Sequence, residues 1–261
     1  MFVAMIVVVQ VLRTFVRAEW FKTSYERFEG DDSNTPITLT VLNLSPVSSS
    51  WERAKIPMIL HQTAPADEGK WHHMWKGCQQ SWFDNLGGFE YKMWTDDDLE
   101  NLMQHRFKNF YPIWSAYPKN IHRIDVARYF ILYEYGGIYA DMDYECVQPF
   151  FSNLPEGKVC IAESAIPGED FQNALMASPA RHPFWHWVLN EVIPYQHVDD
   201  VLEATGPRVI SRAIKSVPEA MVFALPHDKF AVQSAPQPSQ EFKRSMRKDI
   251  FAIHHGSCVY C

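Results

Sequence analysis

The sequence predicts an α/β domain built on one open sheet. Three short apolar runs, each ending in polar residues, support this prediction: IPMILHQT at 56–63, IYADMD at 138–143 and KVCIAE at 158–163. Such runs are typical of strands buried on both faces, and stretches with helical spacing separate them. Ligands gather beyond the carboxyl ends of strands in open α/β sheets, so the polar residues ending each run are candidates for a binding site.

Length and composition fit a single packed domain and exclude some classes of function. Of 261 residues, 47% are hydrophobic and 14% aromatic, which supplies a core and leaves rings for stacking on sugar-like ligands. The net charge of −7 argues against a nucleic-acid-binding surface. The five cysteines lack the spacing of a zinc site, and their odd number leaves a free thiol or an intermolecular pair in an oxidising compartment.

The first 54 residues precede the predicted domain. The apolar run at 2–12 is short for a membrane span and closer to the core of a signal peptide. We expect residues 1–20 to form a signal peptide or a short signal anchor, although a buried strand or a truncated chain would give the same pattern. Residues 21–54 are polar, which predicts a stem or linker, and residues 55–261 form the domain.

The first elements of the domain alternate between strand and helix. The strand at 56–63 ends in His61, Gln62 and Thr63, which are therefore placed to meet a ligand. Apolar residues at helical spacing predict a helix over 71–83, and strict alternation predicts a strand over 89–94.

The next helix has a recognisable start. Thr95, followed three residues later by Asp98, predicts an N-cap for a helix running to about 107. The three aspartates at 96–98 then complement the helix dipole instead of binding a metal. The proline-punctuated aromatic segment at 111–118 predicts a loop.

Residues 120–150 carry the strongest chemical signal. Asp125 and Arg128 lie one turn apart on a helix that is apolar nearly all round and therefore buried. The glycine pair at 136–137 predicts a helix end before the strand 138–143. Asp141 and Asp143 are two residues apart on this strand and so face one side, an arrangement that suits Mg²⁺ or Mn²⁺.

The remaining elements close the sheet. We expect strands at 158–163 and 173–177, a helix from Pro183 to about 192, a turn at 204–207 whose backbone amides could hold an anion, a helix over 208–216, and a last element at 249–253. His254 and His255 follow this last element. Neighbouring residues of a strand point in opposite directions, so at most one of the two imidazoles can reach a given site.

Several of these segments together resemble glycosyltransferase family 32, whose members share a DXD-containing sugar-binding region. The segments are IPMILHQT at 56–63, YKMWTD at 91–96, LYEYGGIYADMD at 132–143, NALMASPARHP at 173–183, TGP at 205–207 and the terminal HHGS at 254–257. The family includes fungal Golgi α-mannosyltransferases and the mannosyltransferases of inositol phosphoceramide. The resemblance covers about residues 55–257, in the order of the family.

The resemblance implies a fold, an activity and a location. The fold would be of GT-A type, an α/β architecture with a single Rossmann-like mixed sheet flanked by helices. The activity would be retaining transfer of a hexose, with mannose favoured, from GDP-mannose or a UDP-sugar to a glycan or glycolipid, with Mn²⁺ or Mg²⁺. The location would be the lumen of the Golgi or secretory pathway, with membrane association possible through the N-terminus.

The resemblance also assigns roles to individual residues. Asp143 would bind the metal directly, and Asp141 would be shared between metal and donor, while Asp125 and Arg128 would hold donor hydroxyls. Ser257 would close over the diphosphate. The further candidates are His61, Gln62, Thr63, Thr205 and Gly206 for the donor, and His254 or His255 for the metal.

Two departures from the family pattern leave an alternative open. Ala64 and Cys258 stand where relatives commonly carry tryptophan, which allows a catalytically impaired protein that binds a sugar nucleotide or glycan. A phosphatase with an aspartyl nucleophile would need an early motif, whereas this Asp-Met-Asp lies mid-chain. A double displacement would need a carboxylate such as Glu163 or Asp170, and a same-face transfer needs neither.

Overall fold

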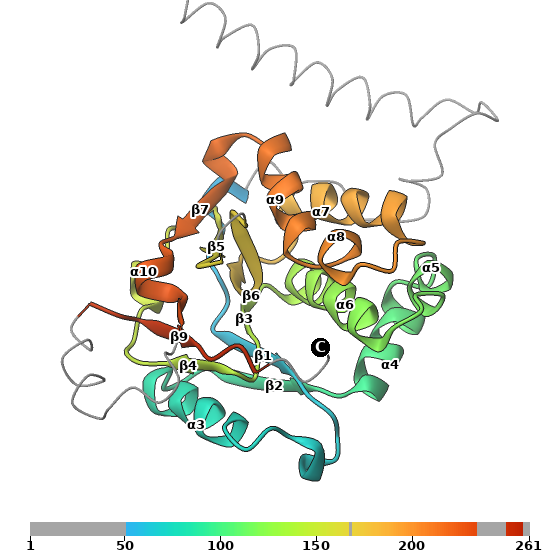
Figure 1. Cartoon of the computed structure of the whole chain (residues 1–261). Helices are drawn as coiled ribbons and strands as arrows, with labels where there is room; N and C mark the ends of the chain where they lie inside the picture. The colour runs from blue at the N-terminus through green and yellow to red at the C-terminus, as the bar shows by residue number, and fades with distance from the viewer. Residues whose placement is uncertain (1–50, 167–168, 234–248, 258–261) are drawn as a thin grey trace, which may run out of the picture. The chain divides into compact units, whose positions relative to one another are not determined.

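The computed structural model describes residues 51–166, 169–233 and 249–257 (Figure 1). The predicted signal or anchor segment and nearly all of the predicted stem lie outside these residues. Within the described part, no helix combines the length and hydrophobicity that a membrane crossing requires.

A six-stranded sheet forms the centre of the domain. Its order is β2-β1-β3-β6-β5-β7, and only β6 runs against the other five strands. This arrangement confirms the predicted α/β class with a mixed sheet flanked by helices. The strands are β1 (Ile59–Thr63), β2 (Glu90–Trp94), β3 (Gly137–Ala140), β5 (Val159–Glu163), β6 (Phe171–Ser178) and β7 (Val222–Leu225).

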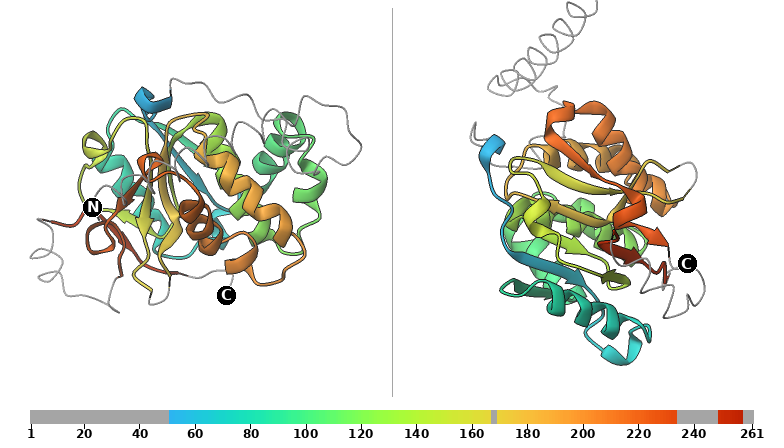
Figure 2. Two further views of the ribbon diagram at one scale, coloured as in Figure 1. Left: turned by 90° about the horizontal axis from the view of Figure 1, so that it is seen from above. Right: turned by 90° about the vertical axis from the view of Figure 1, so that its left-hand side faces the viewer.

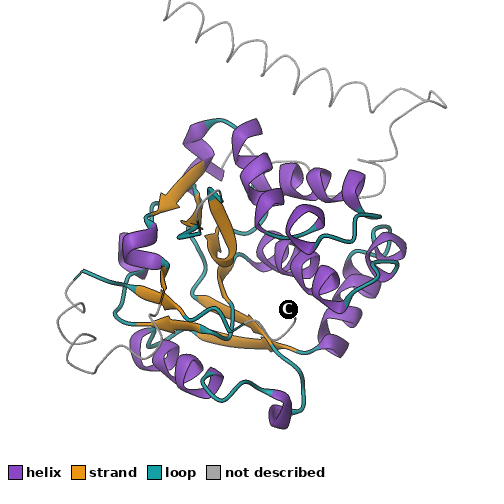
Figure 3. Ribbon diagram, in the orientation of Figure 1, coloured by secondary structure: helices purple, strands orange, loops and turns teal. Residues whose placement is uncertain are grey.

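Helices cover both faces of the sheet (Figures 2 and 3). One core cluster joins the sheet to α4, α5, α6, α7 and α9, and a second joins the opposite face to α3 and α10. The helices are α3 (Trp75–Asn85), α4 (Asp96–Arg106), α5 (Tyr111–Ser115), α6 (Asn120–Tyr135), α7 (Phe184–Val192), α8 (Val201–Ala204), α9 (Pro207–Ser216) and α10 (His227–Phe230).

A small second sheet brings the end of the described chain back to its middle. It consists of β4 (Tyr144–Cys146), β9 (Ala252–His254) and β8 (Val232–Gln233), in the order β4-β9-β8. Tyr144 pairs with His254 across the antiparallel β4 and β9 strands. The residues after β9 therefore lie beside the Asp141–Asp143 segment, which immediately precedes β4.

The strand predicted at 138–143 is shorter than expected. β3 ends at Ala140, and the Tyr144 N–H donates to the Asp141 carbonyl at 3.0 Å, closing a turn over 141–143. The two aspartates thus lie in a turn between two sheets, and the argument that they share one side of a strand is wrong. The turn reverses the chain from the central sheet into the second one.

The helix boundaries show one further correction and one confirmation. The segment at 111–118, expected to be a loop, contains the short helix α5, because Pro112 lies in the first turn, where no intrahelical N–H donor is needed. The predicted cap of α4 is confirmed, since Thr95 and Asp98 form a reciprocal capping box.

The long helix α6 has the predicted bounds and burial. Eleven of its sixteen residues are buried, including Asp125 and Arg128. The helix ends at Gly136, whose φ of +64° lies in the left-handed region that favours glycine. A Cβ at this position would come within 2.5 Å of the Ala180 nitrogen, so the sharp passage from α6 to β3 requires glycine.

Candidate active site

Arg128 ties α6 to the carboxyl end of β3. Its Nη2 lies 3.0 Å from Asp125 Oδ1, and its Nη1 lies 3.3 Å from Asp141 Oδ1. Nη1 also donates to the Asn173 carbonyl of β6 at 3.0 Å. Both Arg128 and Asp125 are 4% exposed, so this guanidinium compensates carboxylates that water hardly reaches. The side chain of Asp141 is 29% exposed and forms the open end of the cluster.

Asp125 is held on both of its oxygens. Asn173 Nδ2 donates to Oδ1 and Thr205 Oγ1 donates to Oδ2, each at 3.0 Å. Burial raises the pKa of Asp125 to about 6, against the opposing effects of Arg128 and of these hydrogen bonds. The carboxylate is therefore ionised at neutral pH, and its position is fixed by α6, β6 and the residue after α8.

Thr205 and Gly206 lie behind Asp125. Thr205 is fully buried, and the carbonyls of Thr205 and Gly206 accept the Tyr129 hydroxyl at 2.6 and 3.4 Å. These contacts turn both residues toward the interior. Thr205 thus supports Asp125 and Gly206 contacts Tyr129, while their contact with a donor stays a prediction.

Asp141 receives a second hydrogen bond from its own strand. The Tyr139 hydroxyl donates to Asp141 Oδ1 at 2.8 Å and is itself 2.8 Å from Thr63 Oγ1. Since the tyrosine proton goes to the carboxylate, the Thr63 hydroxyl is the donor to Tyr139. Burial raises the pKa of Asp141, and Arg128 opposes this shift. The end of β1 therefore helps to orient Asp141 through Tyr139.

Asp143 faces the C-terminal segment. Ser257 donates to Asp143 Oδ2 from its backbone N–H at 2.7 Å and from its hydroxyl at 3.3 Å. On the other carboxylate oxygen, Oδ1, His254 Nε2 approaches to 3.6 Å. Burial alone would raise the pKa of Asp143, but His254 and the Ser257 donors outweigh it and lower the pKa. Asp143 is thus an ionised carboxylate with one oxygen held by Ser257.

The two histidines separate as strand geometry requires. His254 lies beside Asp143, whereas the His255 ring is 3.0 Å from Glu145 Oε2. His255 contributes its backbone N–H, which donates to the Asp143 carbonyl at 3.0 Å. Of the two predicted alternatives, His254 is therefore the one whose imidazole lies at the Asp143 carboxylate, and a metal role stays a prediction.

The Asp141 and Asp143 carboxylates and the His254 imidazole lie in one neighbourhood of the domain. His254 Nε2 faces Asp143 Oδ1 at 3.6 Å, which is within ion-pair distance when the imidazole is protonated. Two carboxylates and an imidazole suit Mn²⁺ or Mg²⁺. In the described part of the chain, no group of three or more His, Cys, Asp or Glu side chains is arranged to hold a metal ion. A cation at this turn would therefore need most of its ligands from water and substrate phosphates.

The residues ending β1 do not all face the site. His61 is fully buried, with Nε2 2.9 Å from the Gly136 carbonyl and Nδ1 accepting from Trp94 at 3.1 Å. Burial lowers the pKa of His61 to about 4. The structure therefore assigns His61 to packing, which corrects the predicted donor contact. Gln62 is also buried, 3.5 Å from the Asp141 carbonyl, and the partly exposed Thr63 is nearest the opening.

Three residues of the site have roles that the sequence did not indicate. Tyr139 sits inside an apolar strand and was indistinguishable from a core residue. Asn173 belonged to a recognised motif but carried no assigned role. Trp75 donates its indole N–H to Ser257 Oγ at 2.9 Å, a contact between residues 182 positions apart that no local pattern reveals.

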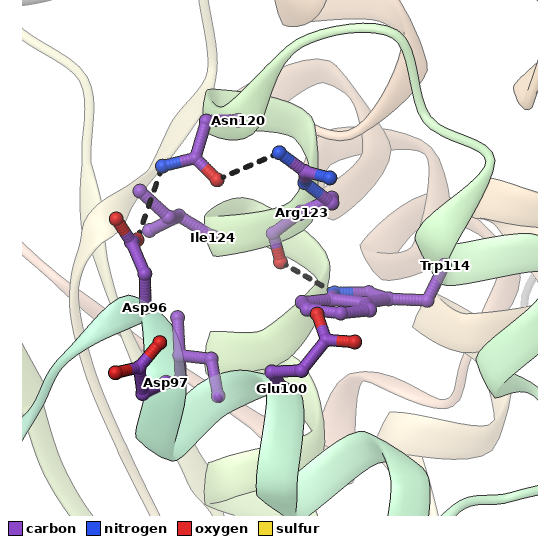
Figure 4. Close-up of a pocket in the computed structure, with 8 residues that line it drawn as sticks. Asp96, Asp97, Glu100, Trp114, Asn120, Arg123 and Ile124 are labelled. Carbon is purple, nitrogen blue, oxygen red and sulfur yellow. Dashed lines mark hydrogen bonds between the residues drawn. The ribbon is translucent and has the colours of Figure 1, made fainter.

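A separate pocket of about 330 Å³ lies between α4, α5 and the start of α6 (Figure 4). Asn120 donates to Asp96 at 3.0 Å and accepts from Arg123 at 3.2 Å. The lining of the pocket carries three carboxylates, at Asp96, Asp97 and Glu100, and one guanidinium, at Arg123. This excess of negative charge disfavours an anionic diphosphate, so the pocket differs in chemistry from the centre around Arg128.

Comparison with known families identifies the segment that holds these carboxylates. Residues 72–165 match the family described as glycosyltransferase sugar-binding region containing DXD motif. This segment is therefore similar to the sugar-binding region of glycosyltransferases. The match includes α6, Asp141 and Asp143, and it confirms the resemblance drawn from the sequence.

Curated relatives extend the similarity beyond this region. Inositol phosphoceramide mannosyltransferase 1 of Schizosaccharomyces pombe is 31% identical over 166 residues, which is 62% of this chain and 51% of that protein. Inositol phosphoceramide mannosyltransferase 2 of the same organism is 34% identical over 181 residues, which is 66% of this chain and 50% of that protein. Mannosyl phosphorylinositol ceramide synthase CSH1 of Saccharomyces cerevisiae is 30% identical over 164 residues, which is 60% of this chain and 42% of that protein. The matches span about half the length of these relatives or less.

Solved structures show a distant likeness of fold. The match to PaToxG glycosyltransferase covers 78% of this chain and 79% of that protein, with a TM-score of 0.47 and 17% sequence identity. The match to mouse xyloside xylosyltransferase 1 covers 86% of this chain and 93% of that protein, with a TM-score of 0.42 and 13% sequence identity.

Proposed function

We propose that this protein is a metal-dependent retaining glycosyltransferase that moves a hexose from a nucleoside-diphosphate sugar to a glycan or glycolipid hydroxyl. The carrying observation is the cluster of Asp125, Arg128, Asp141 and Asp143, which lies within the matched residues 72–165, together with His254, which approaches Asp143 from β9. Mannose is the favoured sugar, because the curated relatives are named for mannosyl transfer.

The proposed roles follow the charges and the exposure of the cluster. Asp143 and His254 would hold the cation, with Asp141 as a shared ligand of cation and donor. A bound Mn²⁺ or Mg²⁺ would supply Lewis-acid stabilisation of the diphosphate. Arg128 opposes protonation of Asp141 and orients its carboxylate, and the more exposed end of the cluster at Asp141 would accept hydrogen bonds from sugar hydroxyls.

The transfer would break the bond between the anomeric carbon and the diphosphate oxygen. The bonding electrons would leave with the nucleoside diphosphate, and a new bond would form between the anomeric carbon and the acceptor oxygen. The acceptor proton would pass to the leaving diphosphate oxygen. Ser257, which reaches Asp143 from the C-terminal segment, would help to close the diphosphate side against water.

A same-face course is favoured over a double displacement. Glu163 Oε2 is 3.5 Å from His227 Nδ1 and accepts the His227 N–H at 3.2 Å. The carboxylate of Asp170 is 2.7 Å from Lys215 Nζ and is half-exposed. Both acids are engaged by neighbouring residues, and neither contacts the Arg128 cluster. This arrangement supports a mechanism in which no enzyme carboxylate attacks the anomeric carbon.

Localisation and membrane association form part of the same proposal. The relatives act on ceramide-based acceptors by their names, which supports a glycolipid acceptor and a place in the Golgi or secretory pathway. Association through the N-terminus stays a prediction, because residues 1–50 lie outside the described part.

A donor panel tests the proposal. The full chain is incubated with Mn²⁺ and with GDP- and UDP-sugars, and release of nucleoside diphosphate is compared between the wild type and Asp143→Ala. We expect one donor to be turned over and the variant to be inactive. Tight binding of a donor with no release in the presence of candidate acceptors would favour the alternative, a non-catalytic sugar-nucleotide-binding protein. Equal release by both proteins would contradict the proposal.

A further inference from the structure

Trp75 occupies an unusual place between two distant parts of the domain. It is the first residue of α3, is 5% exposed, and belongs to a small apolar cluster with Ala64 after β1 and Met142 between the two aspartates. The ring therefore lies next to the Asp141–Asp143 turn without itself carrying a charge. A buried indole N–H needs an acceptor, and here the acceptor is the hydroxyl of Ser257.

The contact with Ser257 continues directly to Asp143. Trp75 Nε1 donates to Ser257 Oγ at 2.9 Å, and Ser257 Oγ lies 3.3 Å from Asp143 Oδ2. An indole can only donate, so the serine oxygen accepts from Trp75 and its single proton is left to point at the carboxylate. Trp75 thus fixes the orientation of the Ser257 hydroxyl.

The same relay leaves the other oxygen of Asp143 available. The Ser257 backbone N–H also donates to Oδ2, at 2.7 Å, so both Ser257 donors converge on one carboxylate oxygen. Oδ1 is the oxygen that faces His254. Hydrogen bonds that fix one oxygen of a ligating carboxylate orient the other oxygen toward the metal, as the hydrogen-bond partners of metal ligands commonly do.

The segment after β9 has few other anchors near its end. The His255 N–H donates to the Asp143 carbonyl at 3.0 Å, and Gly256 then turns the chain with a φ of +61°. Beyond Gly256, Ser257 hydrogen-bonds to Asp143 and Trp75. Among the described residues, loss of the indole donor therefore leaves Asp143 as the hydrogen-bond partner of Ser257.

We propose that Trp75 is a positioning residue that latches the C-terminal segment onto the Asp141–Asp143 turn, and thereby strengthens binding of a divalent cation with a nucleoside diphosphate. The latch itself stands on the contacts of this chain, whereas its effect on cation and nucleotide binding rests on the proposed function. α3 would in this way support the site from the side opposite to α6.

The latch is tested by hydrogen exchange on the full chain without metal. Trp75→Phe keeps most of the ring and removes the donor, so exchange of the Ser257 amide should become about three- to tenfold faster, the range expected for one neutral hydrogen bond. Trp71→Phe is the matched control, because Trp71 belongs to the same apolar cluster but donates to the Pro65 carbonyl. Exchange in this control should stay within about twofold of the wild type. Equal rates in Trp75→Phe and wild type would overturn the latch.

Its effect on the site is tested by calorimetric titration of Mn²⁺ in the presence of GDP or UDP. We expect about three- to tenfold weaker apparent Mn²⁺ binding in Trp75→Phe and in Ser257→Ala, and no further loss in the double variant, because both changes break one relay. Strictly additive losses, or an equal loss in Trp71→Phe, would overturn the positioning role. Absence of Mn²⁺ and nucleotide binding in the wild type would instead contradict the proposed function, while hydrogen exchange would still decide the latch.

Discussion

The positive charge of Arg128 compensates two carboxylates of the site, Asp125 and Asp141. Its guanidinium contacts Asp125 and Asp141, and it is 4% exposed. Without it, a fully enclosed carboxylate and a partly enclosed one would face each other with no cation between them. Removal of one partner of a buried pair is far more costly than the net value of the pair, because the remaining charge is stranded.

We therefore expect Arg128→Met to lower the free energy of unfolding by about 3–5 kcal/mol. Arg106→Met is the matched control: Arg106 pairs with Glu134, is 59% exposed on its side chain, and shares Glu134 with Arg181. The Glu134 side chain is 5% exposed but keeps Arg181 as a partner, and the exposed Arg106 should therefore contribute only about 0–1 kcal/mol. Urea unfolding of the metal-free protein measures both variants, and similar losses in the two would show that Arg128 is not the buried balancing charge.

At this scale, local spacing predicted only part of the site. The i, i+3 spacing of Asp125 and Arg128 on an apolar helix correctly predicted that they lie one turn apart on a buried helix. The approach of His254 and Ser257 to Asp143 depended on the family resemblance, since more than 110 residues separate them. The inward orientation of His61 and Thr205 could not be predicted, because it depends on partners supplied by other elements.

The passage from α6 into β3 sets where the carboxylates lie. Gly136 ends the helix in the left-handed region, and a Cβ there would meet backbone atoms of Ala180 and Ser178 and the ring of Pro57 at 2.5–2.8 Å. The aspartates follow only five and seven residues later. A shift of this junction would move Asp141 relative to Arg128.

Gly136→Ala should consequently destabilise the protein by more than about 2 kcal/mol, because backbone strain adds to steric overlap. Gly87→Ala is the control, since a Cβ at Gly87 would meet nothing within 4 Å and its φ is not in the left-handed region. Thermal or urea unfolding compares the two. A loss below about 0.5 kcal/mol in Gly136→Ala would mean that the junction relaxes freely.

Sequence patterns predicted the elements better than their ends. Strand and helix order along the chain was correct wherever apolar runs or helical spacing were long, as in α6, β1, β2 and β5. The strand at 138–143 was drawn too long, because the turn at 141–143 is stabilised by pairing of β4 with β9, a strand more than 100 residues away. Long-range pairing of this kind leaves no trace in the local pattern.

The whole domain carries buried histidines whose charging opposes folding. Burial lowers the pKa of His61, His182 and His186 to about 4 from an ordinary value of 6.5. The unfolded chain therefore binds more protons than the folded one between these values, so stability is complete above about pH 6.5 and is lost as the pH falls toward 4. Asp125, with its pKa raised to about 6, acts in the opposite sense over part of this range.

We expect a net loss on the order of 4 kcal/mol in the free energy of unfolding between pH 7 and pH 5, because three imidazoles outweigh one carboxyl. His182→Gln should flatten this profile, as glutamine can still accept the Phe184 N–H that His182 Nδ1 accepts. Exposed His105→Gln should leave it unchanged. A flat profile for the wild type would show that the histidines are not held neutral by burial.

We propose the Asp141–Asp143 turn as the metal-dependent centre of sugar transfer. The most direct measurement is nucleoside diphosphate release from the donor selected by the panel, before and after chelation of divalent cations, in wild type, Asp143→Asn and the exposed control Asp228→Asn. We predict that chelation abolishes release and Mn²⁺ restores it, that Asp143→Asn is slower by roughly 100-fold or more, and that Asp228→Asn matches wild type. Release that survives chelation, or an Asp143→Asn rate within about threefold of wild type, would contradict the claim.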